Sequence, residues 1–183
     1  MPALDAAPLL LGWEMRRNTP EGNIGLIIIE TEAYHQDDPA SHSYRGVTAR
    51  TAPMFEAGGR LYIYFTYGMH YCLNIVTGPK GRGEAVLIRA GEPTAGVKIM
   101  QKNRNQEDIY RLANGPAKLT QALGINDTKL SGKMLDKSSI LLVPPKSNLK
   151  PADVVASPRI GIREAVEMPW RFYISGNKYV SKL

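Results

Sequence analysis

Cysteine, metal-ligand spacings and long apolar runs are what this 183-residue sequence has least of. Its single cysteine, Cys72, cannot form a disulfide within the chain. Neither a Cys-x-x-Cys nor a His-x-x-x-His pair is present to hold zinc, so we expect no metal. No apolar run approaches the length of a bilayer span, and the first residues lack the pattern of a secretory signal. We therefore expect a cytoplasmic protein that does not enter a membrane.

The composition supports a folded, moderately basic protein. With 43% hydrophobic residues, a chain of this length can build one substantial core, which predicts a single domain over residues 1–183. Lysine and arginine exceed aspartate and glutamate by 23 to 17, a net charge of +6. Such an excess raises the expectation of a nucleic-acid partner, because phosphate contacts supply most non-specific affinity. Charge alone leaves the question open, since many basic proteins bind no nucleic acid.

The last quarter of the chain carries much of this positive charge. It is either a surface that faces phosphates or a solvated rim, and the sequence does not separate the two readings. The residues concerned are Arg159, Arg163, Arg171, Lys178 and Lys182.

The most informative stretch is 25–34, where the apolar run 26–29 passes directly into Glu-Thr-Glu-Ala-Tyr. Its β-branched content, between a glycine and a polar cluster, predicts a strand. Alternation along a strand would place two carboxylates beside an aromatic ring. The residues on that face would be Leu26, Ile28, Glu30, Glu32 and Tyr34. The alternative is a strand that ends in solvent, where acids are ordinary.

Further elements follow from local pattern. A turn cluster at 18–23 predicts a hairpin between a strand at 13–17 and the strand at 25–34. Strands at 60–67, 69–77 and 84–90 predict an antiparallel meander, with Gly68 at an unusually apolar hairpin tip. Residues 36–53 read as a long loop or as short helical turns. We expect helices at 94–105, 109–114 and 116–123, a short helix or turn at 6–11, and strands at 140–143, 153–156 and 170–174.

These residues could serve an enzyme that hydrolyses the bond between base and sugar in duplex nucleic acid. Such an enzyme extrudes the nucleotide, holds the base against aromatic rings and directs water onto the sugar carbon. Glu32 could orient and deprotonate the water and stabilise an oxocarbenium-like sugar. Tyr34 and Tyr64 could stack on the base. Tyr67, at the apolar tip, could be the wedge that fills the vacated gap.

Each residue also has a structural reading. Tyrosines on strands usually pack in a core, which we favour for Tyr62 and Tyr71. His42 could be a loop histidine bonded to backbone, and Asn74 a satisfied buried amide. Two other functions stay open: a non-catalytic module that only grips a nucleic-acid strand, and a hydrolase for free nucleosides, in which the apolar tip would have no purpose.

A series of motifs resembles the alkyladenine (3-methyladenine) DNA glycosylase family, in order and over nearly the whole chain. The motifs are Ile29-Glu30-Thr31-Glu32-Ala33-Tyr34, Ser41-His42-Ser43, Arg50-Thr51-Ala52-Pro53-Met54-Phe55, the run 62–74, Leu87-Ile88-Arg89-Ala90, Asn114-Gly115-Pro116-Ala117-Lys118-Leu119, Arg159-Ile160-Gly161-Ile162 and Arg171-Phe172-Tyr173.

The resemblance implies a chemistry in which water, not a lysine, is the nucleophile. Glu32 would activate that water, and Arg89 and the backbone carbonyl of Ile160 would help to hold it. The product would be an abasic site without strand cleavage, and neither metal nor organic cofactor would be needed. The implied substrate is double-stranded DNA that contains a damaged purine of the 3-methyladenine, 7-methylguanine or hypoxanthine type. We expect a monomer, which suits a domain that scans DNA.

The resemblance also implies a fold and a pocket. The fold would be mixed α/β (α+β), with a curved antiparallel sheet, peripheral helices and a projecting β-hairpin. Asn74 would crowd the 2-amino group of guanine and so exclude the normal base. The residues around the flipped base would be Tyr34, His42 and Tyr64, and those that enter the duplex would be Tyr67 and Met69.

Overall fold

The fold is organised around β2 (Gly22–Tyr34), the long strand that the sequence predicts at 25–34. The computed structural model describes residues 1–145 and 149–181, so Lys182 of the basic last quarter lies outside it. β2 begins three residues earlier than predicted, because it pairs with β1 (Glu14–Thr19) across a tight turn as far as Thr19 and Gly22. The predicted hairpin is therefore confirmed.

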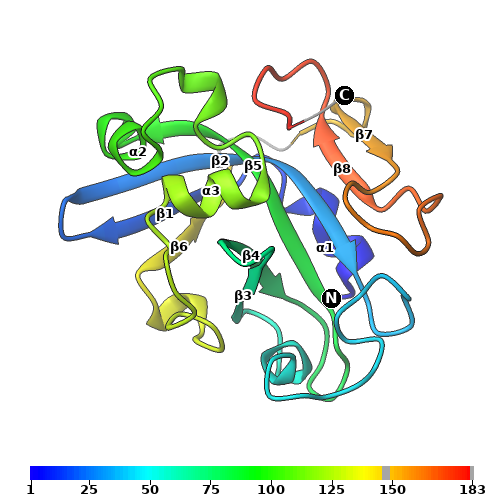
Figure 1. Cartoon of the computed structure of the whole chain (residues 1–183). Helices are drawn as coiled ribbons and strands as arrows, with labels where there is room; N and C mark the ends of the chain where they lie inside the picture. Colours follow the sequence, from blue (N-terminus) through cyan, green and yellow to red (C-terminus); the bar gives the residue numbers. More distant parts are fainter. Residues whose placement is uncertain (146–148, 182–183) are drawn as a thin grey trace.

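Eight strands of the described residues form one curved antiparallel sheet (Figure 1). The main path runs β3-β4-β5-β2-β1-β6, and β8 pairs with both β2 and β7. The predicted meander is confirmed as the three strands at one end of that path. The remaining strands are β3 (Leu61–Thr66), β4 (His70–Val76), β5 (Ala85–Ala95), β6 (Ile140–Val143), β7 (Val154–Ser157) and β8 (Arg171–Ile174).

β2 does not keep the strict alternation that the sequence analysis assumed. Its register with β5 shifts between Ile28 and Glu30 and again between Glu30 and Thr31. Such irregularities add an unpaired residue and change which face the following side chains occupy. Leu26 and Ile28 consequently pack in the same apolar cluster as Ala33, which alternation had placed on the opposite face. The predicted single face from Leu26 to Tyr34 is wrong at its apolar end.

Three α-helices in the described part of the chain lie at the periphery of the sheet: α1 (Ala3–Leu9), α2 (Val97–Arg104) and α3 (Pro116–Ala122). The helix predicted from residue 94 begins later, because Ala95 still pairs with β2 and Gly96 adopts a left-handed φ of 67°. The helix predicted at 109–114 is only a 3₁₀ turn, Ile109–Arg111. It ends because Asn114 forms a bridge with Ala90 of β5. The helix predicted at 116–123 is confirmed.

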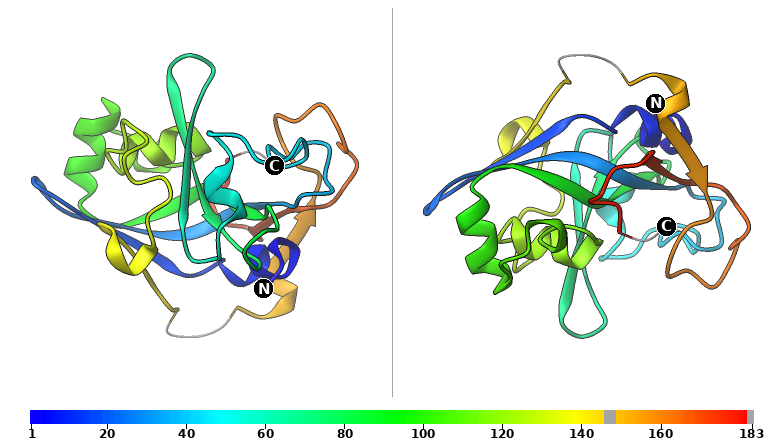
Figure 2. Two further views of the ribbon diagram at one scale, coloured as in Figure 1. Left: turned by 90° about the horizontal axis from the view of Figure 1, so that it is seen from below. Right: turned by 90° about the horizontal axis from the view of Figure 1, so that it is seen from above.

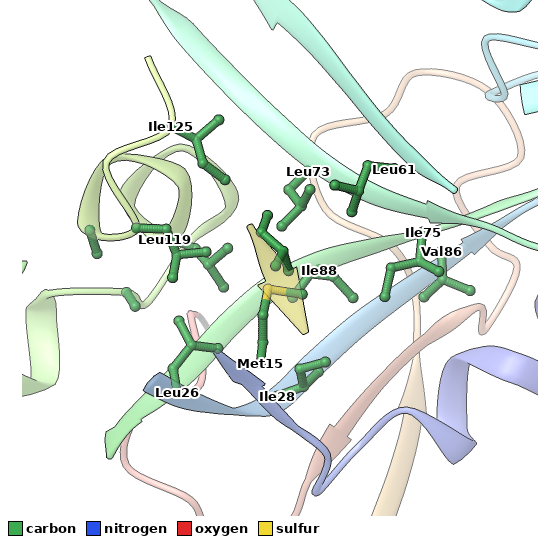
Figure 3. Packing of buried hydrophobic residues seen from close by; sticks show 14 of the residues in the cluster. Met15, Leu26, Ile28, Leu61, Leu73, Ile75, Val86, Ile88, Leu119 and Ile125 are labelled. Carbon is green, nitrogen blue, oxygen red and sulfur yellow. The ribbon is translucent and has the colours of Figure 1, made fainter. Parts of the chain in front are cut away.

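The core lies between the sheet and α3. Met15 of β1 and Ile88 of β5 are fully buried there, together with Leu119 of α3. Figure 3 shows these side chains interleaved with those of Leu73 and Ile28. Fully burying a leucine or isoleucine stabilises a fold by about 1.5–3 kcal/mol. The cluster therefore holds β2 and β5 rigidly at the positions where their polar residues begin.

The β3–β4 hairpin projects from the body of the protein (Figure 2). Its strands pair from Leu61 with Ile75 to Thr66 with His70. Tyr67 and Gly68 form the tip with positive φ angles of 51° and 69°, and this backbone shape reverses the chain sharply. The side chains of Tyr67 and Met69 are 79% and 67% exposed. The apolar hairpin tip predicted around Gly68 is confirmed, and its large side chains lie in solvent.

Candidate active site

An open cavity of about 390 Å³ lies between the β3–β4 hairpin, β5 and the loop at 160–164. This volume falls within the range of about 300–1,000 Å³ that is usual for small-molecule pockets. Seven of the residues proposed for the site line it: Tyr34, His42, Tyr64, Tyr67, Asn74, Arg89 and Ile160. Met69, the other proposed intercalating residue, is exposed on the hairpin and is not part of the lining.

Glu32 lies directly behind this lining and is 0% exposed. The Tyr34 hydroxyl donates a hydrogen bond of 2.7 Å to its Oε2, and the backbone N–H of Ile160 donates one of 2.8 Å to its Oε1. Nη1 of Arg89 lies 3.2 Å from Oε1. These three contacts hold the Glu32 carboxylate in one orientation. Tyr34, Ile160 and Arg89 themselves line the cavity, so Glu32 lies directly behind its wall.

A second buried carboxylate, Glu30, lies behind Arg89. Its Oε1 accepts hydrogen bonds from Nε of Arg89 at 3.1 Å and from Nε of Arg171 at 2.7 Å. Ser181 adds bonds of 2.7 Å from its backbone N–H and 2.8 Å from its hydroxyl. Burial lowers the pKa of Arg89, but the charges of Glu32 and Glu30 more than offset this and the net shift is upward. Arg89 therefore stays a cation that bridges the two carboxylates.

The aromatic walls of the cavity are uncharged. Burial, reinforced by the charge of Glu32, raises the pKa of Tyr34 well above its usual value, and burial does the same for Tyr64. The rings of His42 and Tyr64 meet edge to face with centroids 4.5 Å apart. Nδ1 of His42 lies 2.9 Å from the hydroxyl of Tyr62. The pKa of His42 is lowered to about 4, mainly by burial and to a smaller extent by the positive charge of Arg50. The imidazole is therefore neutral at pH 7.

Asn74 satisfies its structural reading and also lies in the wall of the cavity. It is buried, and its Nδ2 donates a hydrogen bond of 3.0 Å to the backbone carbonyl of Tyr62. Tyr62 is likewise buried as predicted, yet it too lines the cavity. Asn74 and Tyr62 are therefore each part of the buried interior and of the cavity wall at the same time.

Comparison of the sequence with known proteins identifies the family of this chain. A sequence profile described as methylpurine-DNA glycosylase (MPG) matches residues 1–178. The chain belongs to the methylpurine-DNA glycosylase family. Membership makes the protein a DNA N-glycosylase, and it confirms the resemblance on which the pocket assignments depend.

Individual relatives of this glycosylase carry the name "Putative 3-methyladenine DNA glycosylase". One from Carboxydothermus hydrogenoformans is 52% identical over 155 residues, which cover 85% of this chain and 81% of the relative. One from Francisella tularensis subsp. tularensis is 49% identical over 180 residues, 98% and 93% of the two chains. One from Methanoculleus marisnigri is 47% identical over 157 residues, 85% and 81%. The similarity therefore covers 85–98% of this chain.

The glycosylase also contains a buried ion pair that the sequence analysis did not find. Arg159 binds both carboxylate oxygens of Asp38, one through Nη1 and one through Nη2 at 2.9 Å. Its guanidinium lies over the rings of Tyr34 and Trp170, 4.7 and 4.8 Å from their centroids. Arg159 therefore packs against the ring of Tyr34 and helps to fix its position. It also precedes Ile160 in the chain, and the backbone N–H of Ile160 donates a hydrogen bond to Glu32.

This pair corrects the reading of the basic last quarter. Arg159 and Arg171 are only 5% and 4% exposed, and both bind buried carboxylates. They are neither phosphate-facing residues nor a solvated rim. Arg163, by contrast, is exposed and lines the cavity. The motif around Arg159 marked the segment as important, but no sequence spacing connects it to Asp38, 121 residues away.

Within residues 1–145 and 149–181, no group of three or more His, Cys, Asp or Glu side chains is arranged to hold a metal ion. No helix in the same part of the chain has the length and apolar character to cross a bilayer.

Proposed function

We propose that this glycosylase removes alkylated or deaminated purines of the 3-methyladenine, 7-methylguanine and hypoxanthine type from double-stranded DNA, after rotating the damaged nucleotide into the cavity. One observation carries the proposal: a buried carboxylate, Glu32, is held directly behind the lining of a cavity with uncharged aromatic sides, by three donors that line it. The names of the relatives support the class of substrate.

The proposed reaction is hydrolysis of the N-glycosidic bond. The bond between C1′ and the base nitrogen breaks, and its electron pair leaves with the purine. The oxygen of a water molecule bonds to C1′ while Glu32 accepts a proton from that water. A purine alkylated at N3 or N7 is cationic and therefore a good leaving group, because the departing electron pair leaves it neutral. Hypoxanthine departs as an anion, which takes up a proton from solvent while Glu32 releases the proton that it accepted.

The arrangement around Glu32 suits this role. Tyr34 and Ile160 each supply one hydrogen bond, and a carboxylate has about four lone-pair directions, so capacity remains for a water molecule. Arg89 and the carbonyl of Ile160, which are 3.5 Å apart, would hold that water on its other side. The negative charge of Glu32 would also stabilise the oxocarbenium-like sugar in the transition state.

The cavity walls and the hairpin supply the remaining functions. Tyr34, His42 and Tyr64 would hold the flipped purine between their rings. Asn74 would exclude guanine through a clash with its 2-amino group. The exposed Tyr67 and Met69 would enter the duplex and fill the space that the flipped nucleotide leaves. We propose that the protein does this as a monomer, in the cytoplasm beside the chromosome.

The direct test is base release from defined duplexes. The purified protein would be incubated with duplexes that each contain one 3-methyladenine, 7-methylguanine, hypoxanthine or ethenoadenine. Release of the base, with an abasic site left in an uncut strand, supports the proposal. Tight binding to all duplexes without release would instead favour a non-catalytic nucleic-acid module.

Replacing Tyr67 with alanine is expected to lower activity on duplex DNA about 10- to 100-fold, because unstacking a base step costs a few kcal/mol that the wedge helps to offset. Activity on the same lesion in single-stranded DNA, where no stack has to be opened, should fall far less. The measurement is single-turnover base release from both substrates. Tyr67→Phe retains the ring and should stay close to the unmodified protein. Equal losses on the two substrates would contradict the wedge role.

A further inference from the structure

The ring of Tyr64, which lines the cavity, has a guanidinium over one of its faces. The Cζ of Arg50 lies 5.1 Å from the centroid of this ring. Arg50 does not line the purine cavity. It lines a neighbouring hollow of about 490 Å³ together with Pro53, Ile63 and Phe65, and Tyr64 lines both. Tyr64 therefore contacts both Arg50 and the space proposed for the base.

The charge of Arg50 is not balanced by a partner. Its hydrogen bonds go to neutral oxygens: a long one of 3.4 Å from Nη2 to the carbonyl of Phe65, and one to the side chain of Tyr62. Among the residues that the structure describes, no carboxylate lies within ion-pair distance of it. Arg159 behind Tyr34 is different, because Asp38 neutralises it. Of the two guanidiniums that back the cavity rings, only Arg50 adds a net positive charge to its surroundings.

The charge of Arg50 acts electrostatically on residues that line the cavity. His42 lines the cavity, and after burial the charge of Arg50 is the second cause that lowers the pKa of its imidazole. A cation over an aromatic face is attracted by the electron density of the ring. Because Arg50 already interacts with one face of the Tyr64 ring, a cationic base on the other face is attracted less strongly to the ring. It is also repelled directly by the charge of Arg50.

We infer that Arg50 determines how this glycosylase ranks cationic against neutral damaged purines, by weakening the hold of Tyr64 on a positively charged base. This inference rests on the proposed function and deepens it. Alkylation at N3 or N7 makes a purine cationic, whereas hypoxanthine is neutral. Arg50 therefore shifts the preference of the cavity toward neutral lesions, and a variant without the charge shifts it back toward cationic ones.

The experiment compares two lesions in one DNA sequence. Single-turnover rates and half-saturating enzyme concentrations for 7-methylguanine and hypoxanthine would be measured with the unmodified protein, Arg50→Met and Arg50→Lys. Any contact of Arg50 with a phosphate is the same for both duplexes, so it cancels in the ratio of the two specificity constants. The ratio of 7-methylguanine to hypoxanthine is expected to rise about threefold in Arg50→Met, since the cation–π interaction of an exposed guanidinium such as that of Arg50 is modest.

Two further variants separate the charge of Arg50 from its packing and from the net charge of the protein. Arg50→Lys retains the charge and should leave the ratio near that of the unmodified protein. Arg45→Met removes an exposed arginine of the same loop that has no described ring contact, and it should also leave the ratio unchanged. The expected pattern is a shift in Arg50→Met alone.

The outcomes distinguish this inference from the function on which it rests. Release of both lesions with an unchanged ratio in Arg50→Met overturns the inference and leaves the proposed function standing. An equal rise in Arg45→Met overturns it as well, because net charge would then explain the shift. If the unmodified protein releases only cationic lesions, an unchanged specificity constant for 7-methylguanine in Arg50→Met overturns the inference, since it requires that constant to rise. If the protein releases neither lesion, the proposed function and the inference are both overturned.

Discussion

Base release is expected to fall about 10²- to 10⁴-fold when Glu32 is replaced by glutamine, the range that a general base usually contributes. Glutamine has the same shape as glutamate and can still accept a hydrogen bond from the N–H of Ile160, while the Tyr34 hydroxyl can turn to accept one from the new amide. It cannot accept a proton from water, and it carries no charge to stabilise the sugar. Binding to lesion-containing duplex should therefore stay largely intact.

Single-turnover release from a methylated duplex measures the first effect, and a binding titration on the same duplex measures the second. Glu56→Gln is a suitable control, because Glu56 lies outside the cavity and pairs with the exposed Lys80. It should change neither quantity. Retained turnover in Glu32→Gln would defeat the proposed mechanism. Lost binding would indicate that Glu32 is needed mainly to hold the cavity together.

The parts of the fold that the sequence predicts are those set by local pattern. Two examples are the hairpin reversal at Gly68 and the strand that leads into Glu32. Alternating or β-branched residues between turn residues define such elements without reference to distant parts of the chain. The resemblance to a family then supplied the residues of the cavity wall, which come from five separate segments. Local pattern could not have brought them together.

What the sequence does not predict depends on pairs of distant segments. The irregularities near Ile29 and Arg89 exist only in the pairing of β2 with β5, so alternation along one strand could not show them. They allow Arg89 to reach both Glu30 and Glu32. The pairing of Asp38 with Arg159 is of the same kind, since a single acid in a polar loop gives no sign of its partner.

The Asp38–Arg159 pair is expected to be important for stability outside the apolar core. Both side chains are 0% exposed, and Asp38→Ala would leave the guanidinium of Arg159 buried without its carboxylate. Breaking a buried pair in this way costs about 3–5 kcal/mol of unfolding free energy. Urea unfolding of the variant should show the loss as a lower midpoint with an unchanged slope.

An exposed ion pair is the matched control for this loss. Glu56 and Lys80 are 3.5 Å apart with side chains that are 42% and 74% exposed, so Glu56→Ala should cost less than about 1 kcal/mol. The double variant Asp38→Ala/Arg159→Met removes both buried charges and should recover much of the stability lost in Asp38→Ala. If Asp38→Ala were no more destabilising than Glu56→Ala, water would have to reach Arg159. Tyr34 would then lack the rigid support that holds its hydroxyl on Glu32.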